Sequence, residues 1–185
     1  TALGYGTLNA QESDSANQAV YNTAVGSYAG ALLTTGIYNT FMGGGAAGSG
    51  VVTGDDNVAV GYTAGANLTS GYHNTFVGSL CGDGTDDGVQ NTAVGKSALS
   101  GNCANENVAV GYQSLLISTA GRNTAVGWGA GDSNTVGQDN VYIGYDCAAY
   151  ANNATEGGSN TYIGAFARPS AATVDDEIAI GRYVL

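Results

Sequence analysis

The chain has 185 residues, with 15 acidic and 4 basic side chains and a formal net charge of −11. Nucleic acids and anionic membrane surfaces bind proteins through clustered lysine and arginine, so this composition argues against both as partners. No apolar run approaches the ~20 residues that cross a bilayer, so we expect no membrane insertion by this segment.

A pentapeptide recurs along the whole chain. Asn-Thr-Ala-Val-Gly at residues 22–26 returns in related form, with successive Asn positions 16 to 20 residues apart. A shortened copy at residues 1–4 and a degenerate one at 177–181 bring the number of copies to eleven. A fixed short period with a β-type core is typical of a solenoid, in which each repeat forms one rung. Nine copies begin with asparagine: Asn22, Asn39, Asn57, Asn74, Asn91, Asn107, Asn123, Asn140 and Asn160.

We expect one short strand in each copy. With Asn as position one, position two is mostly Thr or Val and position four is mostly Val or Ile. Side chains alternate along a strand, so these two positions share one face and position three lies on the other. Neither face carries the polar row of a half-solvated sheet, and such strands are usually covered on both faces. Position three is usually Ala, with four aromatic exceptions: Phe41, Phe76, Tyr142 and Tyr162.

The segments between the copies carry turn signals and no helical periodicity. We therefore predict an all-β, parallel β-solenoid (a β-roll or β-helix) of about eleven rungs of ~17 residues each, forming one repeat domain over residues 1–185. Strands about 4.8 Å apart make a rod on the order of 50 Å long. Longer segments at 7–20 and 146–159 are expected to form irregular loops. Glycines lie three residues before many copies, where the chain must turn back: Gly36, Gly54, Gly71, Gly88, Gly137 and Gly157.

Two columns of the predicted stack have structural explanations. The asparagines are expected to form a ladder at a corner, with amides bonding up and down the stack as in cross-β assemblies. Cys81 and Cys147 occupy a position, three after the motif glycine, that is Ala in most copies. Together with Cys103 they form an odd, widely spaced set, so we expect small interior side chains and no disulfide framework.

The repeated Asn-Thr-Ala-Val-Gly-x-x-Ala-Gly motif resembles two kinds of trimeric fibre. One is the head repeat of trimeric autotransporter adhesins, a left-handed parallel β-roll, and the other is the shaft of phage tail fibres. The resemblance covers essentially the whole chain. It implies a left-handed coil, a parallel homotrimer, and an extracellular place on a cell surface or a virion. It also implies that the Val/Ile face packs among three chains, while the small face fills each chain's own coil.

The chain differs from the fibres that it resembles in two respects. The period is longer than that of the adhesin head, which implies a larger cross-section and longer outer loops. The aromatic residues at position three also need interior room that a minimal roll lacks.

The function that this resemblance implies is a structural and adhesive fibre segment. Such a segment presents or forms a receptor-binding surface, with the chain itself and a host glycan or protein as partners. A monomeric solenoid that binds ice, calcium or sugar is an alternative, and a polysaccharide-cleaving spike is another. We expect no enzymatic activity and no cofactor. The chain has one histidine, His73, and no serine or cysteine lies in a recognisable nucleophile motif.

Exposed aromatic residues are the candidate glycan-binding site. Position six, directly after the motif glycine, holds Tyr5, Tyr62, Tyr112, Trp128 and Tyr145, and the last three belong to successive copies. If they face solvent, they form a strip suited to stacking on sugar rings. The alternative is packing at a subunit seam or over the corner glycine.

Acidic turns are the candidate metal site. Asp83, Asp86 and Asp87 lie in one turn that offers the several oxygens that calcium prefers. The chain lacks the calcium-binding nonapeptide and the EF-hand loop, so solvated turn acids are the ordinary explanation.

Two further features concern glycosylation and ice binding. Asn67 and Asn153 begin glycosylation sequons in expected loops. Regular threonine columns bind ice in other solenoids. Here the threonine column at position two is interrupted by four β-branched apolar residues, which suit a buried face: Val58, Val108, Val141 and Ile178.

Overall fold

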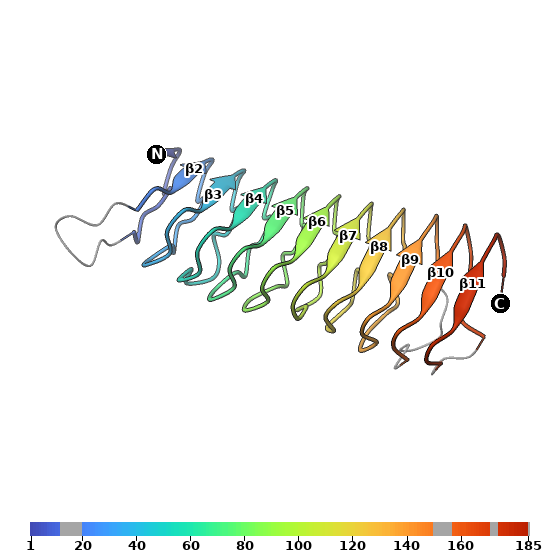
Figure 1. Ribbon diagram of the computed structural model, residues 1–185. Coiled ribbons are helices and arrows are strands. Elements are labelled where there is room, and N and C mark those ends of the chain that lie inside the picture. The colour runs from blue at the N-terminus through green and yellow to red at the C-terminus, as the bar shows by residue number, and fades with distance from the viewer. Residues whose placement is uncertain (12–19, 150–156, 171–173, 185) are drawn as a thin grey trace.

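The computed structural model describes residues 1–11, 20–149, 157–170 and 174–184, which form eleven short strands in one parallel sheet and no helix (Figure 1). The prediction of an all-β parallel solenoid is confirmed. No helix long and apolar enough to cross a membrane occurs in this described part. The strands are β1 Ala2–Leu3, β2 Thr23–Val25, β3 Thr40–Met42, β4 Val58–Val60, β5 Thr75–Val77, β6 Thr92–Val94, β7 Val108–Val110, β8 Thr124–Val126, β9 Val141–Ile143, β10 Thr161–Ile163 and β11 Ile178–Ile180.

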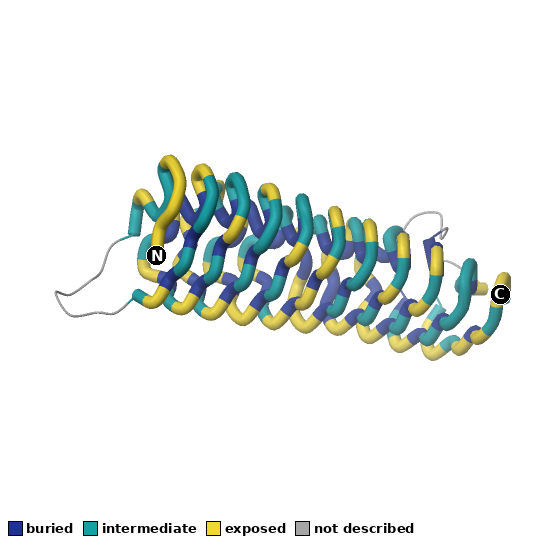
Figure 2. The backbone as a smooth tube through the Cα atoms, turned by 90° about the horizontal axis from the view of Figure 1, so that it is seen from above, coloured by how far each residue is buried: buried dark blue, intermediate teal, exposed yellow. Residues whose placement is uncertain are grey.

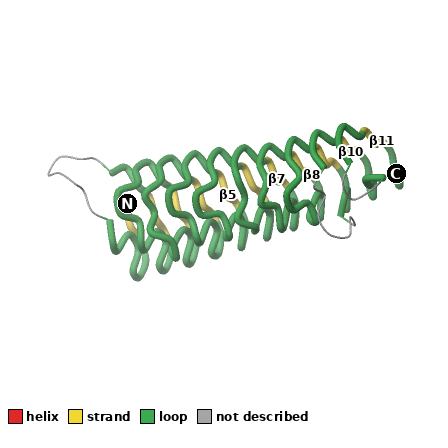
Figure 3. The backbone as a smooth tube through the Cα atoms, turned by 90° about the horizontal axis from the view of Figure 1, so that it is seen from below, coloured by secondary structure: helices red, strands yellow, loops and turns green. Residues whose placement is uncertain are grey.

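Each strand pairs with the next strand in the chain, so spatial order equals sequence order. The register aligns the repeat positions: Phe41 of β3 pairs with Ala24 of β2 on one side and Ala59 of β4 on the other. The strands form one row along the rod, and loops and turns complete each rung (Figure 3). Every position of the repeat therefore becomes a column that runs the length of the rod.

The rod is regular wherever the structure describes it. The two ends of the chain lie at opposite ends of the rod, and burial recurs at the same place in successive rungs (Figure 2). Much of the predicted irregular loops at 7–20 and 146–159, with the sequon residue Asn153, lies outside the described residues.

Position three points into the coil, as the resemblance implied. Its side chains from Ala24 to Ala179 are at most 3% exposed. The opposite wall is position eight, three after the motif glycine, which is Ala in most rungs and is fully buried from Ala29 to Ala167. Cys81 and Cys147 belong to this wall, and together with Cys103 they are buried and free, as expected of small interior residues. Burial raises the pKa of the Cys81 thiol to about 12 and those of Cys103 and Cys147 to about 11.

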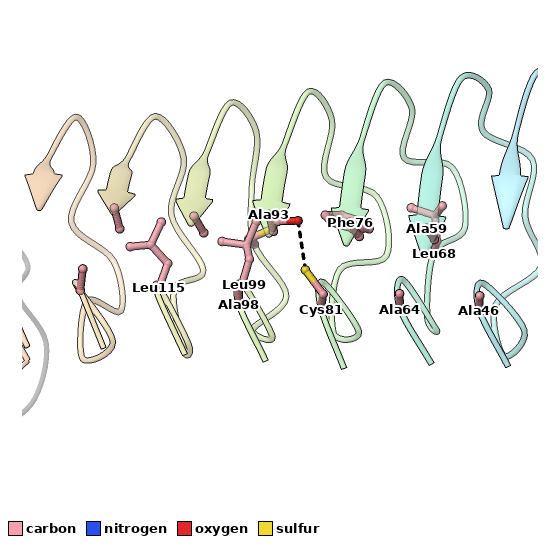
Figure 4. Packing of buried hydrophobic residues seen from close by; sticks show 14 of the residues in the cluster. Ala46, Ala59, Ala64, Leu68, Phe76, Cys81, Ala93, Ala98, Leu99 and Leu115 are labelled. Carbon is pink, nitrogen blue, oxygen red and sulfur yellow. Dashed lines mark hydrogen bonds between the residues drawn. The ribbon is translucent and has the colours of Figure 1, made fainter. Parts of the chain in front are cut away.

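Glycines at position nine make the room that the interior aromatic rings need. A Cβ atom at Gly82 would lie only 2.6 Å from the ring of Phe76, and one at Gly30 would lie 2.9 Å from the ring of Phe41. Two rungs with Ala at position three carry Leu99 and Leu115 at position nine, and these side chains fill the same interior space (Figure 4). The interior is therefore filled by large side chains that lie against glycines on their own rung or a neighbouring rung.

This size matching predicts a non-additive double variant. Phe76→Ala leaves a cavity and should lower the free energy of unfolding by about 3–5 kcal/mol. Gly82→Leu alone should also destabilise, because its side chain would collide with the ring. Leu99 and Leu115 adopt φ of 54° and 48° at this position, close to the 59° of Gly82, so leucine fits the backbone there.

The combined Phe76→Ala/Gly82→Leu variant should regain roughly half of the loss in urea unfolding, as coupled core sites do. Additive losses in the double variant would contradict the size matching.

Candidate functional site

The most extensive candidate surface is the outward side of the sheet. We define the outer face as the side chains at positions two and four of the strands. In β2 to β11 these side chains are half-buried or exposed, while position three between them is buried. A continuous apolar stripe of this kind on a folded chain marks an interaction surface. Its exposed large apolar members are Leu3, Met42, Val77, Val94, Val126, Ile143, Ile178 and Ile180.

An asparagine column runs along the corner just before the strands. The structure brings all nine motif asparagines together there, and each is at most 4% exposed. The Oδ1 atom of Asn74 accepts the backbone N–H of Asn91 on the next rung at 2.9 Å. Its Nδ2 atom donates to the carbonyl oxygen of Gly88 at 2.8 Å and to Oδ1 of Asn57 at 3.1 Å. One amide side chain thus ties its own rung to both neighbours.

The same backbone N–H to Oδ1 bond recurs at 2.7–3.0 Å on each successive rung from Asn39 to Asn160. In the last copy Glu177 replaces asparagine, and its N–H still donates to Oδ1 of Asn160 at 2.8 Å. A carboxylate has no N–H to donate, so the side chain of Glu177 instead accepts a 2.7 Å bond from the hydroxyl of Tyr162. Burial, and this bond, raise the pKa of Tyr162.

On the nine rungs from β3 to β11, the residue before position one adopts a left-handed backbone although none is glycine. Its φ lies between 54° and 65°, a conformation that costs L-residues roughly 1–2 kcal/mol. The buried asparagine bonds hold the chain in this corner. Four of these nine residues are acidic and one is an arginine, so this edge of the outer face is largely polar and carries a net negative charge. The residues are Tyr38, Asp56, His73, Gln90, Glu106, Arg122, Asp139, Ser159 and Asp176.

Aromatic rings occupy the opposite corner, just after the strands. Tyr112 and Trp128 stack with centroids 5.7 Å apart, and Trp128 and Tyr145 stack at 5.0 Å, both with 13° between the ring planes. Phe166 and Tyr183 extend this column. Sequence reasoning missed those two because they lie at position seven, where a left-handed backbone also turns the side chain outward.

The stacking limits what this aromatic column can bind. The three predicted residues Tyr112, Trp128 and Tyr145 are 39%, 43% and 50% exposed, so they do face solvent. Their planes nearly parallel one another, so each ring covers the face of its neighbour and presents mainly an edge. Tyr62, the fourth predicted residue, lies apart from this column and is 65% exposed.

The predicted calcium residues do not converge. The backbone N–H of Asp87 donates to Asp86 at 2.7 Å, and this bond lowers the pKa of the Asp86 carboxyl. Asp83 adds no third ligand, since no group of three or more His, Cys, Asp or Glu side chains placed to hold a metal occurs among the described residues. The geometry of this turn is that of solvated acids.

Among the described residues, two local groupings of charged side chains were candidates for chemistry. His73 faces Asp56 at 3.6 Å on the exposed surface. Asp132 and Asp146 both lie next to Gly129, and burial raises the pKa of each carboxyl. Asp146 is only 5% exposed, whereas a glycosidase needs two carboxyl groups that both reach a bound sugar.

Comparison with known proteins adds no family. No family model, no curated protein and no solved structure matches the chain.

The asparagine column predicts a large effect from one side chain. Asn74→Ala leaves two buried groups without partners, the N–H of Asn91 and the carbonyl of Gly88. Each orphaned group costs about 1–3 kcal/mol, so urea unfolding should show a loss of roughly 3 kcal/mol. Asn67→Ala is the matched control, because Asn67 is an exposed asparagine outside the column and should change stability by under about 0.5 kcal/mol. Equal losses in the two variants would refute a special role for the column.

Proposed function

We propose that this chain is a segment of an extracellular homotrimeric fibre, of the cell-surface adhesin or phage tail-fibre type. Its role is structural and adhesive: it holds, and in part forms, a surface that binds a host glycan or protein. The observation that carries the proposal is the outer face, an apolar stripe present on every rung.

The composition of the outer face supports burial against other chains. Position four exposes Val, Ile, Leu or Met in rung after rung, and position two carries Thr, Val or Ile. No charged side chain occurs at either position in any strand. A parallel sheet is normally covered on both faces, and the chain's own coil covers only the inner one. Identical stripes on parallel copies, closed around a common axis, supply the missing cover.

The corners of the rung support the same assignment. The largely polar, net negative corner before the strands and the aromatic corner after them flank the apolar stripe. On its side of the stripe, the polar corner limits the contact, as the rim does in other interfaces. Elsewhere the net charge of −11 keeps a long rod soluble. Repetition also allows a long rod to be built by adding rungs, because each rung contacts only its neighbours.

The proposal predicts the mass of the native protein and how one substitution changes it. Light scattering after size exclusion should give three times the 18.3 kDa of one chain. Val94→Lys places a charge on the central part of the outer face, three copies of it at the seam, and should yield folded monomers. Ile117→Lys is the matched control: Ile117 is 46% exposed, against 39% for Val94, but lies off the sheet, and its variant should remain trimeric.

Two outcomes would overturn the proposal. A monomeric native protein would leave the outer face bare and would favour the monomeric ligand-binding alternative. A Val94→Lys variant that remains trimeric would show that the seam lies elsewhere.

A further inference from the structure

A pocket interrupts the aromatic corner near the N-terminal end of the rod. It has a volume of about 300 Å³, and it lies between Tyr28 on the rung of β2 and Tyr62 on the rung of β4. The intervening rung carries Gly44 and Gly45 at the equivalent positions, so no side chain from it fills the space. We call this pocket the tyrosine slot; its lining residues are Ser27, Tyr28, Gly44, Gly45, Tyr62 and Thr63.

The slot differs from the aromatic column in whether the faces of its rings are free for stacking. In the column, rings on successive rungs cover each other's faces. Tyr28 and Tyr62 are two rungs apart, roughly 10 Å along the rod, or twice the strand spacing of about 4.8 Å. Their rings make no contact with each other, and they are 52% and 65% exposed. Two stacking contacts of about 3.5–4.0 Å each take up less than this spacing, which leaves room for one further ring.

The chemistry of the slot selects the class of ring. Its walls are aromatic, its floor is bare backbone, and Ser27 and Thr63 lie at its border. Apolar faces that carry hydroxyls at their edges are the property of pyranose sugars. No charged side chain lines the slot, and a net charge of −11 disfavours acidic sugars.

A second pocket continues the slot along the rod. It has a volume of about 410 Å³, and its lining includes Tyr28 together with Tyr5, Asn9 and Leu32. Tyr5 meets Tyr28 edge to face, with ring centroids 5.4 Å apart. The two pockets share Tyr28, so a ligand longer than one ring can extend from one into the other.

We propose that the tyrosine slot binds one pyranose ring of a neutral glycan whose chain runs along the rod. This inference names a site for the adhesive role proposed above and depends on that role only in expecting a glycan partner. It places the binding residues in the first four rungs, away from the stacked column of Tyr112, Trp128 and Tyr145.

The decisive variant is Gly44→Tyr. A Cβ atom at Gly44 would meet only Tyr62, at an ordinary 3.7 Å, and the residue has no left-handed φ, so the fold tolerates a side chain there. The new ring would stack between Tyr28 and Tyr62 and occlude the slot. We expect unchanged or raised thermal stability, unchanged native mass, and binding weakened by at least about tenfold.

The experiment screens the native chain on a printed array of neutral and acidic glycans, then titrates the neutral glycan with the highest signal. Tyr62→Ala should weaken binding as Gly44→Tyr does, and Trp128→Ala should leave it unchanged. Absence of neutral-glycan binding, or full binding by Gly44→Tyr, would overturn the inference. Binding lost in Trp128→Ala but kept in Gly44→Tyr would also overturn it, in favour of the stacked column. None of these results alters the native mass, so the fibre assembly is tested separately.

Discussion

The hydrogen bonds of the buried asparagine column are the constraint on which the rest of the structure depends. Strands of three residues offer few ladder bonds, and a corner in a left-handed conformation is unfavourable for the residues that occupy it. Each asparagine compensates by accepting an N–H from the next rung and donating to a carbonyl there. Because the bond repeats on every rung, the strands stay in one register, and each repeat position becomes a straight column.

Those columns explain both the interior and the surface. Inside, the narrow coil accepts Phe76 only because Gly82 faces it, and accepts Leu99 only because Ala93 lies opposite. Outside, the same register aligns β-branched side chains into one apolar stripe. At the aromatic corner, rung spacing decides whether rings on neighbouring rungs cover each other or, where glycine intervenes, leave a slot.

The repeat period and the alternation of side chains were enough to predict the parallel solenoid, the strand positions and the inward direction of position three. Other features depend on coil geometry that a linear pattern does not contain. Asp56 and Gln90 adopt left-handed backbone without glycine, because the asparagine bonds of neighbouring rungs hold them there. Tyr28 and Phe166 lie at position seven and join the aromatic corner through the same kind of backbone. The pairing of Gly82 with Phe76 is visible only once the coil brings positions three and nine together.

Assembly into a fibre requires that the outer face be covered in solution. Met42, the single methionine of the chain, lies on that face and is 43% exposed on an isolated chain. Its oxidation by dilute hydrogen peroxide, followed by mass spectrometry of the intact protein, therefore reports directly on the cover. Assembly through the outer face predicts slow oxidation in the native protein and fast oxidation after denaturation. Oxidation of the native protein at the rate of the denatured chain would show that the outer face is bare.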